Sequence, residues 1–160
     1  MTRLSLTEGA GNGVAYEIDD GRTLVWELGD EKPPRALLSR EVDIGSDWIM
    51  RLDRVDFEPG GIAYRHTHPG PGIRYLLFGE ITIESEGQRH TYGAGEAWFE
   101  RGPDPVLATT SADEPSAFVR VLLLPPEWAG RRTIKYVDPA DADKPKTQRA
   151  TIFSEQPVVR

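Results

Sequence analysis

Glycine and proline divide this chain into short segments, and this punctuation constrains the fold more than any other feature. Sixteen glycines and 13 prolines are spread over 160 residues, and the runs between them are rich in Val, Ile, Leu, Tyr, Trp and Phe. Short runs of such residues between turn residues are typical of β-strands, whereas helices need longer segments with a helical period. The chain is therefore predicted to be all-β.

The predicted strands follow one another at even spacing, which favours a sandwich or a barrel. The Asp20-Gly21 step suits the positive φ of a tight turn and predicts a hairpin near the N-terminus. Residues 58–61, Glu-Pro-Gly-Gly, should end a strand. The predicted strands are residues 14–18, 23–28, 36–44, 48–57, 62–68, 73–78, 81–85, 90–92, 97–100, 106–110, 117–124, 133–137 and 150–154.

Charge and cysteine content exclude several classes of function. The chain has 26 acidic and 19 basic residues, a net charge of -7, which disfavours nucleic acid as a partner. It contains no cysteine, so disulfides, thiolate metal sites and thiol nucleophiles are excluded. Any bound metal must be held by nitrogen and oxygen ligands.

The chain shows no membrane or targeting signal. Its first residues lack the apolar run of a signal peptide, and no later stretch approaches the length of a membrane span. We therefore expect a cytoplasmic protein with no membrane partner.

Residues 59–80 resemble the first signature motif of the cupin superfamily. That motif runs glycine, five residues, His-x-His, three or four residues, glutamate, six residues, glycine. Gly60, His66, His68 and Gly79 stand in register with it. The resemblance implies a cupin-type double-stranded β-helix, a jelly-roll barrel that hosts many unrelated functions.

A second stretch, residues 95–110, is similar to the second cupin motif, and the resemblance as a whole spans residues 55–125. We expect residues 1–54 to add strands that pack on or join the barrel, and residues 126–160 to form a C-terminal arm of the same domain. The arm is predicted to pack over the barrel or a partner subunit, or to act as a mobile lid. Small cupins commonly pair through their sheets, so we also expect a homodimer.

Two metal-supporting positions of the cupin motifs are changed in this chain. Metal-binding cupins use the two histidines and the glutamate of the first motif and one histidine of the second. Here Gly72 stands at the glutamate position, and Val106 stands at the second-motif histidine. Thr110 stands at the position of its usual asparagine.

The histidine pair is the strongest candidate for a metal site. His66 and His68 are two residues apart on a predicted strand, so both side chains should point to one face and reach one ion. Two ligands leave the shell incomplete, and substrate, water or another side chain must finish it. Candidates for the missing ligand are Tyr64, Glu100 and His90. The histidines either hold a divalent metal (Fe, Mn, Ni or Zn), serve substrate binding or proton transfer without metal, or only pack; no organic cofactor is expected.

Two arginines lie on predicted barrel strands. Arg74 should face the side where the motif's glutamate would point, unless a bulge turns it outward to a surface acid. An inward guanidinium would repel a cation and attract a carboxylate or phosphate. Arg120, in an apolar strand, needs an ion-pair partner if it is buried. Trp98 and Phe99 are adjacent and must face opposite ways.

Two functions are consistent with this pattern. The first is a small-molecule enzyme of the dioxygenase, isomerase or lyase type, with His66, His68 and Arg74 as catalytic residues and Tyr64, Arg74 and Glu100 as substrate-binding residues. In it, either a metal on the histidines acts as Lewis acid, or a histidine moves a proton while Arg74 stabilises an oxyanion. The second is a non-catalytic binding module for a small anionic metabolite, with a metal-free site.

Overall fold

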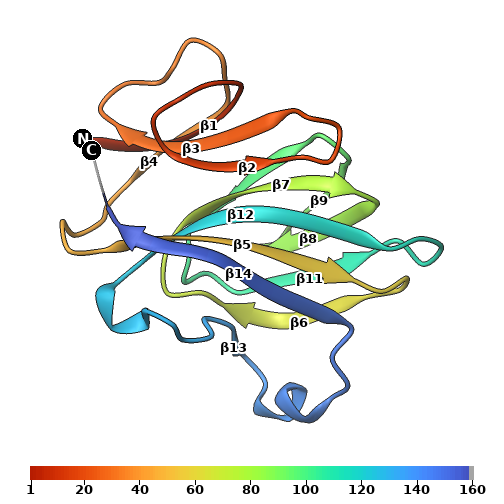
Figure 1. The fold of residues 1–160 in the computed structure, drawn as a ribbon. Coiled ribbons are helices and arrows are strands. Elements are labelled where there is room, and N and C mark those ends of the chain that lie inside the picture. The colour runs from red at the N-terminus through yellow and green to blue at the C-terminus, as the bar shows by residue number, and fades with distance from the viewer. Residues whose placement is uncertain (159–160) are drawn as a thin grey trace.

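The computed structural model describes residues 1–158, which form three antiparallel sheets (Figure 1). Two 3₁₀ helices lie between the later strands. In chain order the elements are β1 (Thr2–Glu8), β2 (Val14–Glu17), β3 (Thr23–Gly29), β4 (Ala36–Val42), β5 (Ile49–Phe57), β6 (Ile62–Thr67), β7 (Gly72–Phe78), β8 (Glu80–Ser85), β9 (Gln88–Gly93), β10 (Ala97–Glu100), β11 (Val106–Thr110), β12 (Ser116–Leu124), η1 (Pro126–Trp128), β13 (Lys135–Tyr136), η2 (Pro139–Asp143) and β14 (Gln148–Pro157).

The sheets are arranged in layers, with the central one covered on both faces. We call them sheet A (β2-β3-β1-β4), sheet B (β10-β7-β12-β5-β14) and sheet C (β13-β6-β11-β8-β9). Sheets B and C face each other and form the barrel, and sheet A lies on the outer face of sheet B (Figure 1). The predicted all-β jelly-roll fold is confirmed.

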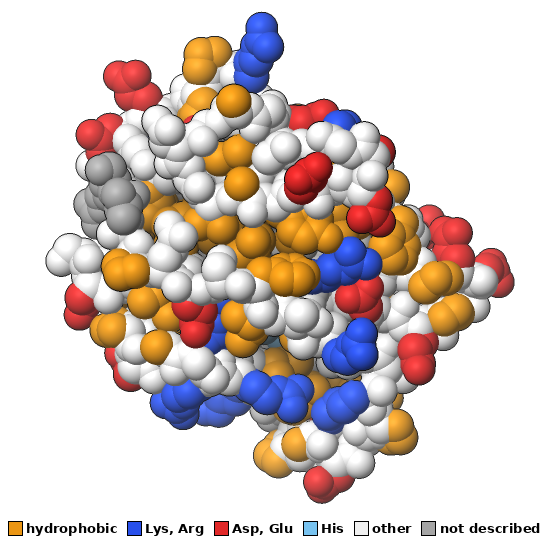
Figure 2. All heavy atoms as spheres, in the orientation of Figure 1, with side chains coloured by type: hydrophobic (Ala, Val, Ile, Leu, Met, Phe, Trp, Pro, Cys, Tyr) orange, Lys and Arg blue, Asp and Glu red, His pale blue; other side chains and the backbone are white. Residues whose placement is uncertain are grey.

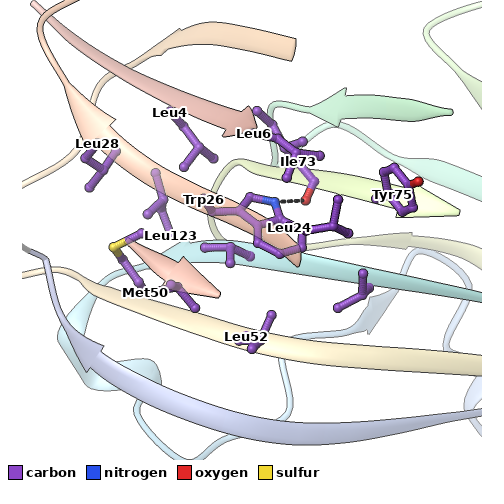
Figure 3. Packing of buried hydrophobic residues seen from close by; sticks show 13 residues of the cluster. Leu4, Leu6, Leu24, Trp26, Leu28, Met50, Leu52, Ile73, Tyr75 and Leu123 are labelled. Carbon is purple, nitrogen blue, oxygen red and sulfur yellow. Dashed lines mark hydrogen bonds between the residues drawn. The ribbon is translucent and has the colours of Figure 1, made fainter. Parts of the chain in front are cut away.

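Alternate side chains of sheet B point to opposite faces and belong to two separate hydrophobic cores. Ile73 and Tyr75 of β7 point to sheet A, whereas Leu76 points into the barrel. The core between sheets A and B also holds Trp26, whose indole Nε1–H donates to the Ile73 carbonyl at 3.0 Å (Figure 3). Trp98 packs in the barrel core, while its neighbour Phe99 packs against the other core.

The N-terminal strands show where the sequence-based predictions succeeded and failed. The predicted hairpin at Gly21 is confirmed, because β2 and β3 pair around it and Gly21 has a φ of 92°. Strand β1 was not predicted, although it is the central partner of β3 and β4. Its large apolar residues are only Leu4 and Leu6, too few for a clear alternation signal.

The C-terminal arm joins both barrel sheets. β13 pairs with β6 of sheet C, and β14 pairs with β5 along the edge of sheet B. The arm therefore runs from one barrel sheet to the other (Figure 1). Within residues 1–158, no helix combines the length and apolar character that a membrane crossing needs.

Sheet A should be energetically coupled to the barrel through the shared core. Leu6 is 0% exposed and Leu37 is 46% exposed. We expect Leu6→Ala to lower the free energy of unfolding by about 3 kcal/mol, because it leaves a cavity in this core. Leu37→Ala is the matched control and should cost less than about 1 kcal/mol. Urea denaturation followed by tryptophan fluorescence measures both; equal losses would contradict the coupling.

Candidate functional site

A cavity of about 490 Å³ lies between sheets B and C and holds the predicted histidine pair. Its walls are largely apolar, with contributions from β5, β6, β8, β11 and β12. The polar groups of its interior are Arg51, Asp53, His66, His68, Glu100 and Arg120. Figure 2 shows the face that carries the opening, where Lys and Arg side chains gather beside a hollow.

His66 is a buried, neutral imidazole whose tautomer is fixed by the backbone. Its Nδ1 lies 2.6 Å from the carbonyl oxygen of Tyr64, which can only accept a hydrogen bond. Nδ1 therefore carries the proton and Nε2 keeps its lone pair. Burial lowers the pKa of His66 below the usual 6.5, so the ring is neutral at pH 7.

His68 is held by the C-terminal arm. Its Nδ1 lies 2.9 Å from the hydroxyl oxygen of Thr133, which is buried beside it. Burial lowers the pKa of His68 well below 6.5, and the nearby positive charge of Arg120 lowers it further. The two imidazole rings are 4.9 Å apart and nearly perpendicular. Both histidines thus present neutral rings to the cavity.

A row of charged residues crosses sheet B opposite the histidines. Arg120 pairs in register with Arg74 on one side and with Asp53 on the other. The Arg120 guanidinium donates from Nε and Nη2 to the two carboxylate oxygens of Asp53, at 2.8 and 3.1 Å. This fork uses two of the five N–H groups of Arg120 and leaves three for a ligand.

Arg74 points into the barrel and pairs with Glu100. Glu100 lines the cavity, whereas Arg74 does not. Its side chain is 1% exposed, and its Nη2 lies 3.1 Å from Oε1 of Glu100. Burial lowers the pKa of Arg74 to about 10, which keeps the guanidinium charged at neutral pH. The alternative in which a bulge turns Arg74 outward is wrong.

Glu100 lines the cavity and is held on both carboxylate oxygens. Oε1 faces Arg74, and Oε2 accepts a hydrogen bond from Trp98 Nε1 at 2.9 Å. Glu100 comes from β10, directly across from Gly72 of β7. A carboxylate thus reaches the cavity from the strand next to the expected one, already paired with an arginine.

Tyr64, a candidate for the missing ligand and for substrate binding, does not share the face of the histidines. Between β6 and β11, Ala63 pairs with Ala108 and His66 pairs with Val106, so β6 carries one extra residue. This bulge shifts the alternation. The Tyr64 ring lies under the ammonium group of Lys144, 4.4 Å away, and is not part of the cavity wall.

His90 also lies away from the histidine pair. It is an exposed residue of β9, and its ring is 4.3 Å from that of Tyr92. It borders a separate groove on the side of β8 to β10, not the barrel cavity. As a further metal ligand it is therefore excluded by its position.

The donor set does not fit the four-ligand metal centre of the cupin motifs. Val106 lies directly across from His66, so the second-motif histidine position presents an apolar side chain. A Cβ at Gly72 would lie 2.6 Å from the Val121 carbonyl oxygen and 3.0 Å from Arg74 Nη1, so no side chain fits there. Among residues 1–158, no three His, Asp or Glu side chains are grouped to hold a metal ion.

Several cavity residues were not singled out by the sequence. Asp53, Arg51 and Gln148 line the cavity, and Thr133 holds His68. The charged positions in residues 49–57 could have suggested Asp53, but polar and apolar residues exchange faces midway along that strand. Thr133 carries no local signal, since it is 65 residues from His68.

Removing one partner of the buried Arg74–Glu100 pair should destabilise the barrel. We expect Glu100→Gln to lower the free energy of unfolding by about 3 kcal/mol, because it leaves the buried Arg74 charge uncompensated. The double variant Arg74→Met, Glu100→Leu should recover most of this loss. Urea denaturation checks both, and a double variant as unstable as Glu100→Gln would contradict this account.

Comparison with known proteins gives one family match and several structural similarities. A family model described as "Cupin domain" matches residues 53–105. A search among curated proteins found no match. Solved structures with a similar fold include the polyketide cyclase RemF from Streptomyces resistomycificus, which is 23% identical with a TM-score of 0.47. The match covers 59% of this chain and 63% of that one.

Two further solved structures have lower TM-scores. A predicted oxalate decarboxylase from Thermotoga maritima is 25% identical, with a TM-score of 0.40 and coverage of 46% of this chain and 65% of the other. An RmlC-like cupin from Shewanella frigidimarina is 20% identical, with a TM-score of 0.42 and coverage of 54% and 86%. The match spans less than two thirds of the length of the cyclase and of the decarboxylase.

Proposed function

We propose that the barrel cavity of this chain, whose residues 53–105 match the cupin family model, is the active site of an enzyme acting on a small organic anion. The proposed chemistry is metal-independent proton transfer, as in isomerases and lyases. The observation that carries this proposal is the neutral, tautomer-fixed His66, which shares the cavity with the partly free guanidinium of Arg120.

His66 has the properties of a general base. Its Nδ1–H is bonded to the Tyr64 carbonyl, so Nε2 is the nitrogen left to meet a ligand. Burial keeps the ring unprotonated at neutral pH. Nε2 would take a proton from a carbon next to a carbonyl group, and the electron pair of that C–H bond would form an enolate.

Arg120 supplies the positive charge that such an intermediate needs. Its free N–H groups would donate to the enolate oxygen or to a carboxylate of the same molecule. Asp53 fixes the guanidinium plane through two hydrogen bonds. The Arg120 side chain therefore loses little conformational freedom when a ligand binds. Return of the proton to another carbon completes an isomerisation; departure of a leaving group completes an elimination.

The predicted roles of the other residues change with this geometry. Arg74 neutralises and positions Glu100 from below, so Arg120 takes the oxyanion-stabilising role that was predicted for Arg74. Glu100 remains a candidate for binding the polar end of the substrate, because it lines the cavity. A homodimer and a cytoplasmic location stay predictions.

Hydrogen–deuterium exchange tests the proposed proton transfer directly. The protein is incubated in D₂O with a panel of small 2-oxo and 3-oxo acids, and loss of the C–H signal beside the carbonyl is followed by ¹H NMR. We expect exchange to be accelerated for at least one acid, and His66→Gln to reduce that rate by about 100-fold, because the base is lost. His90→Gln, an exposed histidine, is the matched control and should leave the rate unchanged.

The pH profile provides an independent readout of the same step. Only neutral His66 can accept the proton, so the exchange rate rises with pH through the pKa of His66. Because burial lowers that pKa, the half-maximal rate should fall below pH 6.5. Binding of an acid without exchange at any pH would support the binding-module function instead, and a profile unaffected by His66→Gln would contradict the assignment of the base.

Metal content should be low, since the cavity offers two of the four cupin ligands. We expect untagged protein from medium supplemented with iron, manganese, nickel and zinc to contain well below one equivalent of metal per chain. Chelator treatment should leave the exchange rate unchanged. Near-stoichiometric metal that disappears in His66→Gln, measured by elemental analysis, would overturn the metal-independent mechanism and favour a metal-dependent cupin enzyme.

A further inference from the structure

The mouth of the cavity is built by the C-terminal arm, outside the stretch that the family model matches. The family model ends at residue 105, whereas Arg132, Lys146 and Arg149 all line the cavity and are exposed. Arg120 and the histidines lie buried in the interior. The cavity therefore has the Arg120–Asp53 ion pair in its interior and a cationic group of residues at its opening, with apolar walls between them.

Positive charge at the opening exceeds what the protein itself neutralises. Arg120 is paired with Asp53 and Arg51 with Glu155, so the interior charges are balanced. At the opening, the Lys146 ammonium is bonded to carbonyl oxygens at the end of η2. Arg132 and Arg149 make no ion pair within residues 1–158, in a chain whose net charge is -7.

An unpartnered polar atom on the same wall points to a ligand as well. Gln148, the first residue of β14, lines the cavity, and its side-chain Oε1 is buried without a hydrogen-bond partner among the described residues. A buried acceptor left unpaired costs free energy, and rotation of the amide would instead turn its N–H groups to this place, where they can donate to an anionic oxygen. The arm thus carries polar groups that its own fold does not satisfy.

We propose that Arg132 and Arg149 form a second anion subsite at the cavity mouth, so that the ligand carries an anionic group at each end. One group lies in the interior at Arg120, and the second, a carboxylate or a phosphate, lies between the two mouth arginines. The apolar walls accommodate the carbon chain that joins them. This subsite rests on the proposed function, since it assumes that the first anionic group binds in the interior.

Matched ligands of equal length test the second subsite by isothermal titration calorimetry on the full chain. The probes are glutarate, which has two carboxylates, pentanoate, which has one, and 4-phosphonobutanoate, which has a phosphonate at the far end. We expect glutarate or the phosphonate to bind about five-fold or more tightly than pentanoate, as two charges facing a solvent-exposed arginine pair allow. The tighter of the two identifies the second group as a carboxylate or a phosphate type.

Substitutions at the cavity mouth test whether Arg132 and Arg149 cause the tighter binding of the dianionic probes. Arg132→Ala combined with Arg149→Ala should bring the affinity for the dianionic probes down to that for pentanoate and leave pentanoate binding unchanged. Arg131→Ala is the matched control, because Arg131 is an adjacent exposed arginine that stacks on Trp128 and does not line the cavity. The advantage of the dianions should also shrink in high salt, because exposed charges are screened.

The outcomes separate the two proposals. Pentanoate binding that is lost in Arg120→Met while the dianions bind no more tightly would retain the interior site and overturn the mouth subsite. A dianion advantage that survives the double substitution, or that Arg131→Ala removes equally, would also overturn it. No binding of any probe would overturn both the interior anion site and the mouth subsite.

Discussion

The Arg120–Asp53 ion pair joins β12, the central strand of sheet B, to its neighbour β5, and the barrel interior is organised around it. Every residue of β12 is buried, because sheet A covers one face of sheet B and the barrel encloses the other. A lone guanidinium in such a strand would be very costly, so its partner must come from the adjacent strand in direct register. The pair leaves three N–H groups of Arg120 without an Asp53 oxygen, and these groups are the hydrogen-bond donors that the cavity can offer to an anionic ligand.

A second buried ion pair, Arg74–Glu100, lies on the other side of β12, between β7 and β10. Arg74 is next to Arg120 in register, and without Glu100 two buried positive charges would lie side by side. Glu100 reaches over from β10 and is itself held by Trp98. The barrel interior therefore holds two arginines, each paired with a carboxylate. The N–H groups of Arg120 that Asp53 does not use can only donate, which favours an anionic ligand over a cation.

Residue patterning predicted the all-β class, the resemblance to the cupin motifs implied the jelly-roll barrel, and local spacing predicted the centre of the site. Strand alternation predicted that His66 and His68 share one face, and both side chains line the cavity. Val106, which stands at the second-motif histidine position, pairs with His66 in the structure. The inward direction of Arg74 followed from strand alternation. Alternation failed at Tyr64, because a one-residue bulge in β6 cannot be read from the residue pattern.

The parts of the site that could not be predicted depend on contacts between distant segments. In residues 49–57, apolar residues change from one face to the other midway, so the pattern does not say whether Asp53 points inward. Thr133 and Gln148 reach the cavity only because the arm pairs with both barrel sheets. Those pairings involve strands far apart in the chain, so the strand pattern of residues 150–154 does not say which strand β14 joins.

The tight packing around Gly72 also limits how this protein could change by mutation. A Cβ at position 72 would lie 2.6 Å from the backbone carbonyl oxygen of Val121 and 3.0 Å from the Arg74 guanidinium, so a glutamate there requires β12 to shift as well as Arg74. Loss of Arg74 alone leaves Glu100 without its buried partner. Neither single substitution is expected to be tolerated well. A route from this barrel to a four-ligand metalloprotein, in evolution or in the laboratory, would have to pass through several coordinated replacements.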